Sequence, residues 1–451
     1  MTGENIIIEK APKTAARSES FFFWAEEEHN IDISTLVKKA ENPKYLYWSD
    51  LKRKSWIPDG ISPQTLWSAI QHSRQIRNQK TPLKTPDNHH FSWIKCAHYD
   101  QLLHDIDLNM GGKLMGLDII PDSKRAHYIS QSLIEESIAS AQLEGAHTTR
   151  KQAVKMLQEK RTPADLGQRM IYNNYQTMCL IEDTLKDQDL TLDMIFDLQT
   201  TLTKNTLKNP DESGRYRRDD EDIVVASADG SQIAHIPPKI DFVKNEMKRL
   251  VAYANDTLEQ DTFTHPLIKA ITLHFWIGYL HPFPDGNGRL ARALFYWYML
   301  KKGYWAFAFI PISTRIKKSP KQYVNAYIYS EQDNNDLTYF IDYNLRQLQL
   351  ARQDFIDFAT KKQNEHGSLS TLSRAMPNMN DRQLGLMQYF ITHPNERTNV
   401  SAMQNIYNVT AATAVKDLKT MHNEELLTKE RRGKNVFYYP TEKLLNATNT
   451  D

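Results

Sequence analysis

A loop rich in proline and glycine separates two strongly apolar helical segments in the second half of the chain, and this break restricts the fold more than any other feature. Residues 267–280 are apolar on nearly every side, which indicates a helix that is buried all round. Pro282 and Pro284 end this helix, because proline lacks a backbone donor and restricts the residue before it. Gly286 and Gly288 then allow a tight turn and a close approach of the backbone to a ligand.

A second helix is expected directly after the loop. Leu290, Leu294 and Trp297 recur at helical spacing from Asn287 onward, and Gly303 provides a C-terminal stop. A loop that leads into a helix N-terminus presents free N–H groups and the positive end of the helix dipole. The order of buried helix, loop and helix therefore predicts an anion site at the loop.

The polar residues of the loop suit nucleotide transfer. His281 can accept a proton near neutral pH, as an attacking hydroxyl requires. Asp285 is a hard oxygen ligand that suits Mg²⁺. Arg289 and Arg292 share one helical face, and each can bind phosphate oxygens as a bidentate donor. The plain alternative is a corner between two helices with a buried histidine and surface arginines. The loop is not a Walker loop, because no Gly-Lys-Ser/Thr follows.

The stretch 281–292, HPFPDGNGRLAR, resembles the signature of the Fic family, His-x-Phe-x-Asp/Glu-Gly-Asn-Gly-Arg-x-x-Arg, at every fixed position. The resemblance implies a mostly helical core that transfers AMP from ATP to a Ser, Thr or Tyr hydroxyl of a protein. Such a transfer needs chiefly positioning and charge neutralisation, which these residue types supply.

The resemblance also implies a role for each fixed position. His281 resembles the base that deprotonates the target hydroxyl, Phe283 the buried anchor of the loop, and Asp285 the Mg²⁺ ligand. Arg289 resembles a stabiliser of the phosphates or of the loop, and Arg292 the contact to the γ-phosphate. The anion hole around the nucleotide phosphates is expected to consist of Gly286, Asn287 and Gly288.

A second segment, 127–145, has apolar residues at helical spacing and ends with Glu144 followed by Gly145, a C-terminal stop. An anion in the last turn opposes the helix dipole, so a cationic partner is expected for this carboxylate, although a solvated glutamate is the alternative. Ser140, Glu144 and Gly145 resemble the Ser/Thr-x-x-x-Glu-Gly/Asn inhibitory motif of Fic proteins. The resemblance implies that Glu144 pairs with Arg292 and fills the space of the γ-phosphate, so that the resting enzyme is largely off.

A third segment, 214–238, has two short apolar runs around Asp229-Gly230, which is a local signal for a β-hairpin. It resembles the Fic flap, which holds the target backbone by strand addition beside the catalytic loop. The alternative is an ordinary surface hairpin. The flap face near the target is expected to consist of Ile223, Val224 and Val225.

The fold class predicted from these features is mainly α. The expected parts are a helical N-terminal extension (1–110), a Fic catalytic domain that begins with the inhibitory helix (111–350), a helix end with a polar linker (351–378), and a winged helix-turn-helix domain (379–445). Within the catalytic domain, Tyr323 follows the catalytic helix at a distance where Fic proteins line the adenine site.

The C-terminal part shows the order of three helices and a hairpin, at 381–392, 400–406, 410–424, 426–428 and 436–439. It resembles the winged helix appended to many bacterial Fic proteins, and such folds place the third helix in the DNA major groove. Docking to a protein or to a second copy is the alternative. The expected groove-facing residues are Thr410, Thr413 and Lys416. The expected phosphate contacts are Lys429, Arg431, Arg432 and Lys434.

Composition limits the remaining possibilities. Apolar residues make up 40% of the 451 residues and charged residues 25%, as in soluble globular proteins, and the net charge of +1 predicts no global attraction to nucleic acid or membrane. No apolar run approaches the ~20 residues of a membrane helix, and no signal peptide is expected. The two cysteines, Cys96 and Cys179, offer neither a disulfide framework nor a metal cluster. A cytoplasmic location, where ATP is available, fits these features.

Two classes of function remain. The first is an auto-inhibited AMP transferase that acts on a protein of unknown identity, with the chain itself as one candidate, and that is expected to form a homodimer. The second is a DNA-binding regulator with a sensory or silent Fic core. The complete set of His281, Asp285, Arg289 and Arg292 favours the first class. Because phosphates are common to all nucleotides, UTP, GTP or a choline-bearing nucleotide remain alternative donors.

Overall fold

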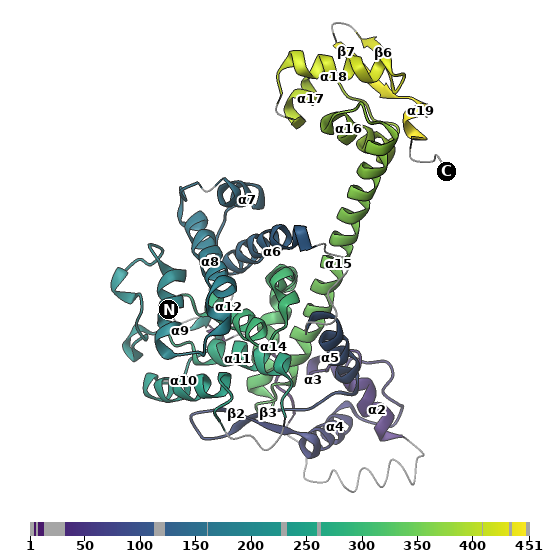
Figure 1. Ribbon diagram of the computed structural model, residues 1–451. Coiled ribbons are helices and arrows are strands. Elements are labelled where there is room, and N and C mark those ends of the chain that lie inside the picture. The colour runs from purple at the N-terminus through teal and green to yellow at the C-terminus, as the bar shows by residue number, and fades with distance from the viewer. Residues whose placement is uncertain are drawn as a thin grey trace. The chain divides into compact units, whose positions relative to one another are not determined.

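The computed structural model describes residues 4–5, 8–12, 32–111, 122–159, 161–226, 232–258, 263–407, 409–432 and 435–447. The chain divides into two compact units, residues 1–353 and 354–451, and each is described by itself (Figure 1). Both units are mainly helical, in agreement with the predicted fold class. No helix in the described ranges has the length and apolar character that a membrane crossing requires.

The first unit begins with small helices and a hairpin that correspond to the predicted helical extension. Ser62 caps the longest of these helices by accepting the Thr65 N–H at 3.1 Å, and Pro63 occupies its first turn. The elements are α2 (Ile33–Glu41), α3 (Trp48–Leu51), α4 (Pro63–Arg77), β2 (Gln79–Lys84), β3 (His90–Trp93) and α5 (Ala97–Met110).

The centre of the first unit is a pair of buried helices, α11 (Pro266–Leu280) and α12 (Asn287–Lys301). Almost every side chain of α11 is buried, as its all-round apolar sequence predicts. Trp276 and Trp297 are fully buried and are among the largest side chains of this core. The two helices thus hold the loop between them in a fixed position.

Other helices pack around the central pair or on its neighbours, and the last of them continues past residue 353 into the second unit (Figure 1). They are α6 (Asp122–Leu143), α7 (Arg150–Gln158), α8 (Leu166–Asp183), α9 (Leu192–Thr203), α10 (Ile240–Ala254), α13 (Ile312–Lys318), α14 (Pro320–Gln332) and α15 (Thr338–Ala375). Short 3₁₀ turns lie at Leu185–Asp187, Pro210–Glu212, Asp219–Glu221 and Trp305–Phe309.

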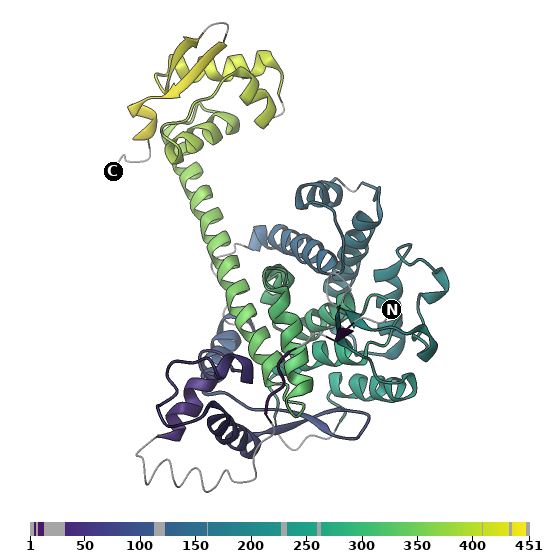
Figure 2. The same ribbon diagram turned by 180° about the vertical axis from the view of Figure 1, so that it is seen from behind.

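A small sheet contains the predicted flap. The strands β4 (Val225–Ala226) and β5 (Gln232–His235) are antiparallel, with Val225 opposite His235. The predicted turn Asp229-Gly230 lies outside the described residues. The strand β1 (Glu4–Asn5) adds to the other edge of β5 in parallel, and Figure 2 shows it as a short dark arrow beside the N label.

The second unit contains α16 (Asp381–Thr392), α17 (Val400–Tyr407), α18 (Ala411–Asn423), β6 (Leu427–Arg432), β7 (Asn435–Pro440) and α19 (Glu442–Leu445). The order of three helices and an antiparallel hairpin is the order that the sequence predicts. Its core is built from residues such as Met387, Phe390 and Leu418. Its assignment as a winged helix-turn-helix domain, and the contact of residues 379–445 with DNA, stay predictions.

The segment 351–378, which the sequence predicts as a helix end and a polar linker, lies largely inside α15. The helix continues to Ala375, far beyond the expected helix end. The residues 359–375 are mostly polar, so no apolar stripe signals a helix there. Hydrophobic periodicity detects helices that bury one face, and it misses polar helices.

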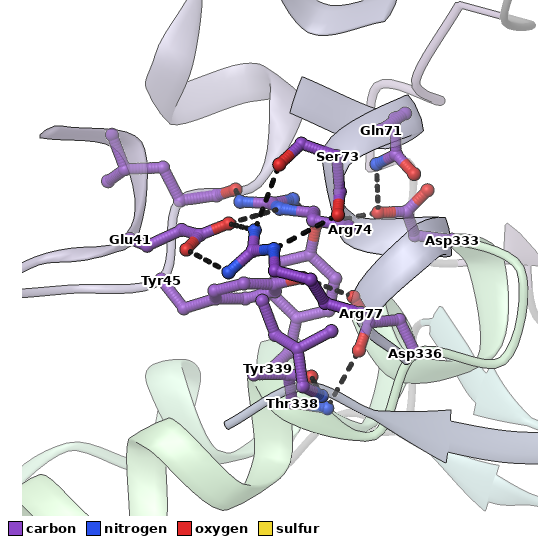
Figure 3. Close-up of polar contacts among 12 residues, drawn as sticks. Glu41, Tyr45, Gln71, Ser73, Arg74, Arg77, Asp333, Asp336, Thr338 and Tyr339 are labelled. Atoms are coloured by element: carbon purple, nitrogen blue, oxygen red, sulfur yellow. Dashed lines mark hydrogen bonds and ion pairs between the residues drawn. The ribbon is translucent and has the colours of Figure 1, made fainter. Parts of the chain in front are cut away.

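A buried polar cluster joins the extension to the turn between α14 and α15 (Figure 3). Arg74 is 3% exposed; its Nη1 donates to the Tyr339 hydroxyl at 3.0 Å, and its guanidinium lies 3.8 Å from the centre of the Tyr45 ring. Tyr45 donates to Asp336 at 2.6 Å, and Tyr339 donates to Asp333 at 2.6 Å. Burial raises the pKa of Asp336 to about 6. Arg74 is therefore the cation that offsets several buried acidic and phenolic groups.

Replacing Arg74 with alanine is expected to lower the free energy of unfolding by ~3–5 kcal/mol, because it leaves the buried carboxylate of Asp333 without its nearby cation. Denaturant unfolding of the full chain, followed by tryptophan fluorescence, measures the loss. Arg77→Ala is the matched control: Arg77 binds Glu41 but is 40% exposed, so we expect ~1 kcal/mol. Equal losses for the two variants would contradict the assignment.

Candidate active site

The loop between α11 and α12 reverses the chain through two residues in the left-handed region. His281 ends α11 with φ 46°, and its N–H donates to the Ile277 carbonyl at 2.9 Å. Gly286 has φ 88° and begins α12. Glycine adopts this conformation without strain, whereas a histidine does so only where its surroundings hold it. The loop therefore depends on contacts that fix His281.

Arg217 supplies these contacts. Its backbone N–H donates to the Pro282 carbonyl at 2.9 Å, and its Nε donates to the His281 carbonyl at 2.8 Å. Its Nη2 donates to the Pro238 carbonyl, so one buried guanidinium joins the loop to both sides of the flap. A cation at the C-terminal end of a helix also offsets the helix dipole. The sequence analysis missed this residue.

The imidazole of His281 is neutral in this environment. Burial, together with the neighbouring His235 and Arg217, lowers its pKa to about 4, although the Gly278 carbonyl and Glu144 act in the opposite direction. Nδ1 lies 3.4 Å from the Gly278 carbonyl, and this contact favours the tautomer with its hydrogen on Nδ1. The lone pair of Nε2 is then available to accept a proton at neutral pH.

Phe283 and Asn287 hold the middle of the loop. The Phe283 side chain is fully buried, 5.4 Å from Phe196 and 6.1 Å from Tyr216 between ring centres. The Asn287 amide accepts the Phe283 N–H at 3.0 Å and donates to the Phe283 carbonyl at 2.8 Å. The side chain of Asn287, predicted in the anion hole, thus braces the loop backbone.

Asp285 and Arg289 form an ion pair at the start of α12. The Arg289 Nη2 lies 3.1 Å from Asp285 Oδ2, and its Nη1 donates to the Leu202 carbonyl at 2.9 Å. Arg289 is fully buried, so its contacts match the loop-stabilising alternative of the two expected roles. Buried Gln199 adds a link that the sequence analysis missed, because it donates to the Asp285 carbonyl at 3.1 Å and accepts the Gly214 N–H at 2.8 Å.

The carboxylate of Asp285 remains 45% exposed in this ion pair. No group of three or more acidic, histidine or cysteine side chains within the described ranges could hold a metal by itself. A single exposed carboxylate fits Mg²⁺, which keeps several waters and shares substrate phosphates. It does not fit a metal that requires a full set of protein ligands.

Glu144, at the end of α6, reaches the N-terminus of α12. Its Oε1 accepts from Arg292 Nη2 at 2.8 Å, and the same guanidinium donates to the Ser140 hydroxyl at 2.8 Å and to the Ser140 carbonyl at 3.0 Å. A Cβ on Gly288 would lie 2.1 Å from this Oε1, so only glycine leaves room for the carboxylate. Gly145 follows with φ 93°, as a C-terminal glycine does.

The charge of Glu144 is stabilised in this position. Burial opposes its ionisation, but Arg292, Arg289 and His281 together hold the pKa of the carboxyl below its usual value. Arg292 is 2% exposed, so its charge needs an anion in contact with it. The carboxylate thus lies where a helix N-terminus and a buried arginine both favour negative charge.

Tyr323 lies on α14 beside this pair. Its hydroxyl contacts His274 Nε2 at 2.8 Å, and burial lowers the pKa of His274 to about 3, so that this histidine is neutral. Burial raises the pKa of the Tyr323 phenol, while the nearby charge of Arg292 acts in the opposite direction. The adenine contact expected for Tyr323 stays a prediction.

The flap lies next to the end of α11. His235 of β5 contacts the Tyr279 carbonyl at 2.7 Å and Glu331 of α14 at 2.8 Å. Val225 pairs with His235 in the sheet, and Val224, just before β4, is exposed. The structure therefore brings the expected inhibitory residues against Arg292 and places the strand that pairs with Val225 next to the end of α11, and Ile223 is half-buried.

Comparison with known proteins shows a similarity to one protein family. Residues 189–299 match the model of the Fic/DOC family. Curated proteins named protein adenylyltransferase Fic are similar to this chain. The protein from Nematostella vectensis is 29% identical over 120 residues, which cover 26% of this chain and 25% of that protein. The protein from Drosophila grimshawi is 30% identical over 135 residues, which cover 30% of this chain and 24% of that protein. The aligned part thus spans about a quarter of the length of these relatives.

A solved structure supports the fold. A variant of Fic-1 from Caenorhabditis elegans is similar, with a TM-score of 0.50 and 16% sequence identity, over 76% of this chain and 87% of that chain. The match extends well beyond residues 189–299, so the helices around the loop share the arrangement of that protein.

The imidazole of His281 is expected to stay neutral down to about pH 5, because its pKa lies near 4. Histidine-labelled protein, observed by NMR between pH 8 and pH 4.5, measures the titration, and the signal lost in His281→Asn assigns the resonance. The resonance of the exposed His89 in the same spectra provides the comparison. A His281 midpoint near 6.5 would rule out the buried, neutral base.

Proposed function

We propose that this chain, whose residues 189–299 form a Fic domain, is an auto-inhibited protein adenylyltransferase that moves AMP from ATP to a Ser, Thr or Tyr hydroxyl of a protein. The contact between Glu144 and Arg292 carries the proposal, because it lies against Gly288 at the N-terminus of α12, next to the neutral His281. The names of the curated relatives agree with this activity.

The geometry of the loop supports the following course of the proposed transfer. The target hydroxyl gives its proton to Nε2 of His281 as its oxygen forms a bond to the α-phosphorus of ATP. The bond from that phosphorus to the bridging oxygen breaks, and pyrophosphate leaves. Backbone N–H groups at Gly286–Gly288 and the N-terminus of α12 stabilise the phosphate charge.

Asp285 is the residue that would hold Mg²⁺. When bound, this ion neutralises phosphate charge. The Arg289 contact keeps the Asp285 side chain at the start of α12, and its exposed oxygens face solvent, where a hydrated ion and phosphates have access.

The same geometry accounts for the resting inhibition. While Glu144 binds Arg292, this arginine is engaged and the carboxylate repels an incoming γ-phosphate. ATP then binds, if at all, in a pose that does not align its α-phosphorus with the target hydroxyl. Removing the carboxylate frees the guanidinium for the γ-phosphate.

The target would add to the flap at β4. The outer edge of β5 is taken by β1, while Val225 lies in the opposite edge strand. An extended target segment that pairs with this edge would bring its hydroxyl toward His281. The identity of the target, a homodimer and donors other than ATP remain open to the labelling assay described below.

DNA binding by the second unit is a second candidate function, and one observation favours it. Asp417 of α18 is buried and binds Arg382 at 2.8 Å and Asn380 at 2.9 Å. Its charge is therefore neutralised inside the unit, while Lys416 and Lys419 of the same helix are exposed. The exposed side of α18 therefore carries less negative charge than the sequence alone indicates, because Asp417 does not contribute to it.

Substituting Glu144 with glycine is expected to raise ATP-dependent labelling of protein by at least about tenfold, because a contact of ~1.5–3 kcal/mol that excludes the γ-phosphate is lost. Incubation with α-labelled ATP and Mg²⁺, with and without candidate targets, measures the label. A panel of α-labelled UTP, GTP and CTP in the same assay compares the donors.

Two controls accompany this assay. Glu135→Gly removes a partly exposed glutamate from the same helix, where it binds Arg150, and it should leave labelling unchanged. The double variant Glu144→Gly with His281→Ala should lose the label. Label that persists without His281 refutes the base, and a Glu144→Gly protein no more active than the parent refutes the inhibition.

For DNA binding, the full chain is expected to shift duplex DNA at low salt, with an affinity that falls steeply as salt rises. The variant Lys416→Glu should weaken binding, and Lys244→Glu on α10, which makes the same change in charge, should not. Mobility shift at several salt concentrations measures both. The absence of a shift at low salt would contradict DNA binding by this unit and would favour the alternative, docking to a protein.

A further inference from the structure

A cavity lies away from the loop, between the N-terminal extension and helices α13 to α15. Its volume is about 420 Å³, within the range of small-molecule sites. Residues of two stretches that are far apart in the sequence, 44–50 and 318–346, line it. Many of the side chains that line it are cationic or aromatic.

The walls are rich in positive charge. Four cationic side chains, Lys44, Lys318, Lys321 and Arg346, line the cavity together with a single acid, Asp50. Lys44 lies 2.5 Å from Asp50. Arg346 donates its Nε to Asp342 at 2.8 Å, which orients the guanidinium. A lysine has three N–H donors and an arginine five, so neither contact exhausts the donors of its group.

The cavity also contains the start of α14. Ser319, Pro320, Lys321 and Gln322 line it, so the first turn of a thirteen-residue helix forms one wall. The N–H groups of a first turn have no partner inside the helix, and the dipole adds positive potential. Ser319 is fixed by a hydroxyl contact to Tyr343 at 2.9 Å.

Tyrosine rings form another wall. Tyr45, Tyr329, Tyr339 and Tyr343 line the cavity. The hydroxyls of Tyr45 and Tyr339 bind Asp336 and Asp333 in the cluster around Arg74, which holds both rings in place (Figure 3). Tyr45, Tyr339 and Tyr343 are almost fully buried, whereas Tyr329 is half-buried and can meet a ligand with a flat ring beside the cations.

This cavity is separate from the loop. Its residues on α14 are 320–322, 325, 326 and 329, which share one side of the helix. Tyr323 and Tyr327 occupy a different side, where they contact His274 and Phe275 of α11. One helix therefore faces the loop region on one side and the basic cavity on another.

We propose that this cavity binds a small phosphorylated molecule, at a site distinct from the catalytic loop. The cationic side chains and the first turn of α14 provide the anion contacts, although Lys44 and Arg346 are also paired with Asp50 and Asp342, and the half-buried Tyr329 is open to a ring or a sugar. The proposal stands on the cavity alone and does not depend on the transferase activity.

The test uses the full chain and two probes, inorganic phosphate and AMP, titrated by calorimetry. The double variant Lys318→Glu/Lys321→Glu is expected to weaken phosphate binding by at least about tenfold, because it removes two charge-assisted contacts. The control Lys244→Glu/Lys248→Glu makes the same change in charge on two exposed lysines of α10 and should bind as the parent does. Arg292→Ala removes a phosphate contact at the loop and should also leave this binding intact.

Three outcomes decide the proposal. Binding that is lost only in the cavity variant supports it, and AMP that binds more tightly than phosphate in the parent assigns a role to the tyrosine rings. If phosphate and AMP bind with equal affinity, and Lys318→Glu/Lys321→Glu loses the binding of both, the site recognises the phosphate group alone. Binding that disappears in Arg292→Ala, or that falls equally in both double-lysine variants, overturns the proposal, because the anion then lies at the loop or responds to net charge.

Discussion

The buried guanidinium of Arg292 is the constraint on which the site depends. At 2% exposure it cannot rely on water, so some anion must contact it at all times. In this structure Glu144 and the hydroxyl and carbonyl of Ser140 fulfil that need. A triphosphate would satisfy the same donors with more charge. Under the proposed function, the inhibited and active states would differ in which anion the arginine binds, and the loop itself need not change shape.

Most polar side chains of the loop contribute to its shape. The Asn287 side chain makes two hydrogen bonds to the backbone of Phe283. Arg289 binds both Asp285 and the Leu202 carbonyl at the end of α9. This leaves backbone N–H groups at the N-terminus of α12, the half-exposed Asp285 and the imidazole of His281 as the groups that can meet a substrate. A rigid frame with few reacting groups suits phosphoryl transfer, where positioning and preorganised charge provide most of the acceleration.

The sequence predicts the features that are local in the chain. The break between α11 and α12, the hairpin strands and the order of the C-terminal helices each follow from residues that are neighbours in sequence. Arg217 and Gln199 escape such reasoning, because their partners lie 64 and 86 residues away and no local pattern marks them. The polar part of α15 escapes it for a different reason, because it has no apolar stripe.

Contacts from outside the matched Fic residues 189–299 fix α14, which carries Tyr323. At its C-terminal end, Asp333 accepts from Gln71 of α4 and from Tyr339 of α15, and Arg74 supports that tyrosine. A shift of α14 would move Tyr323 relative to the Arg292 charge that acts on it. The buried cluster of the extension therefore supports the position of Tyr323, for which the sequence predicts an adenine contact. The extension and the helices around the loop are therefore linked through α14, whose C-terminal end contacts Gln71 of α4 and Tyr339 of α15.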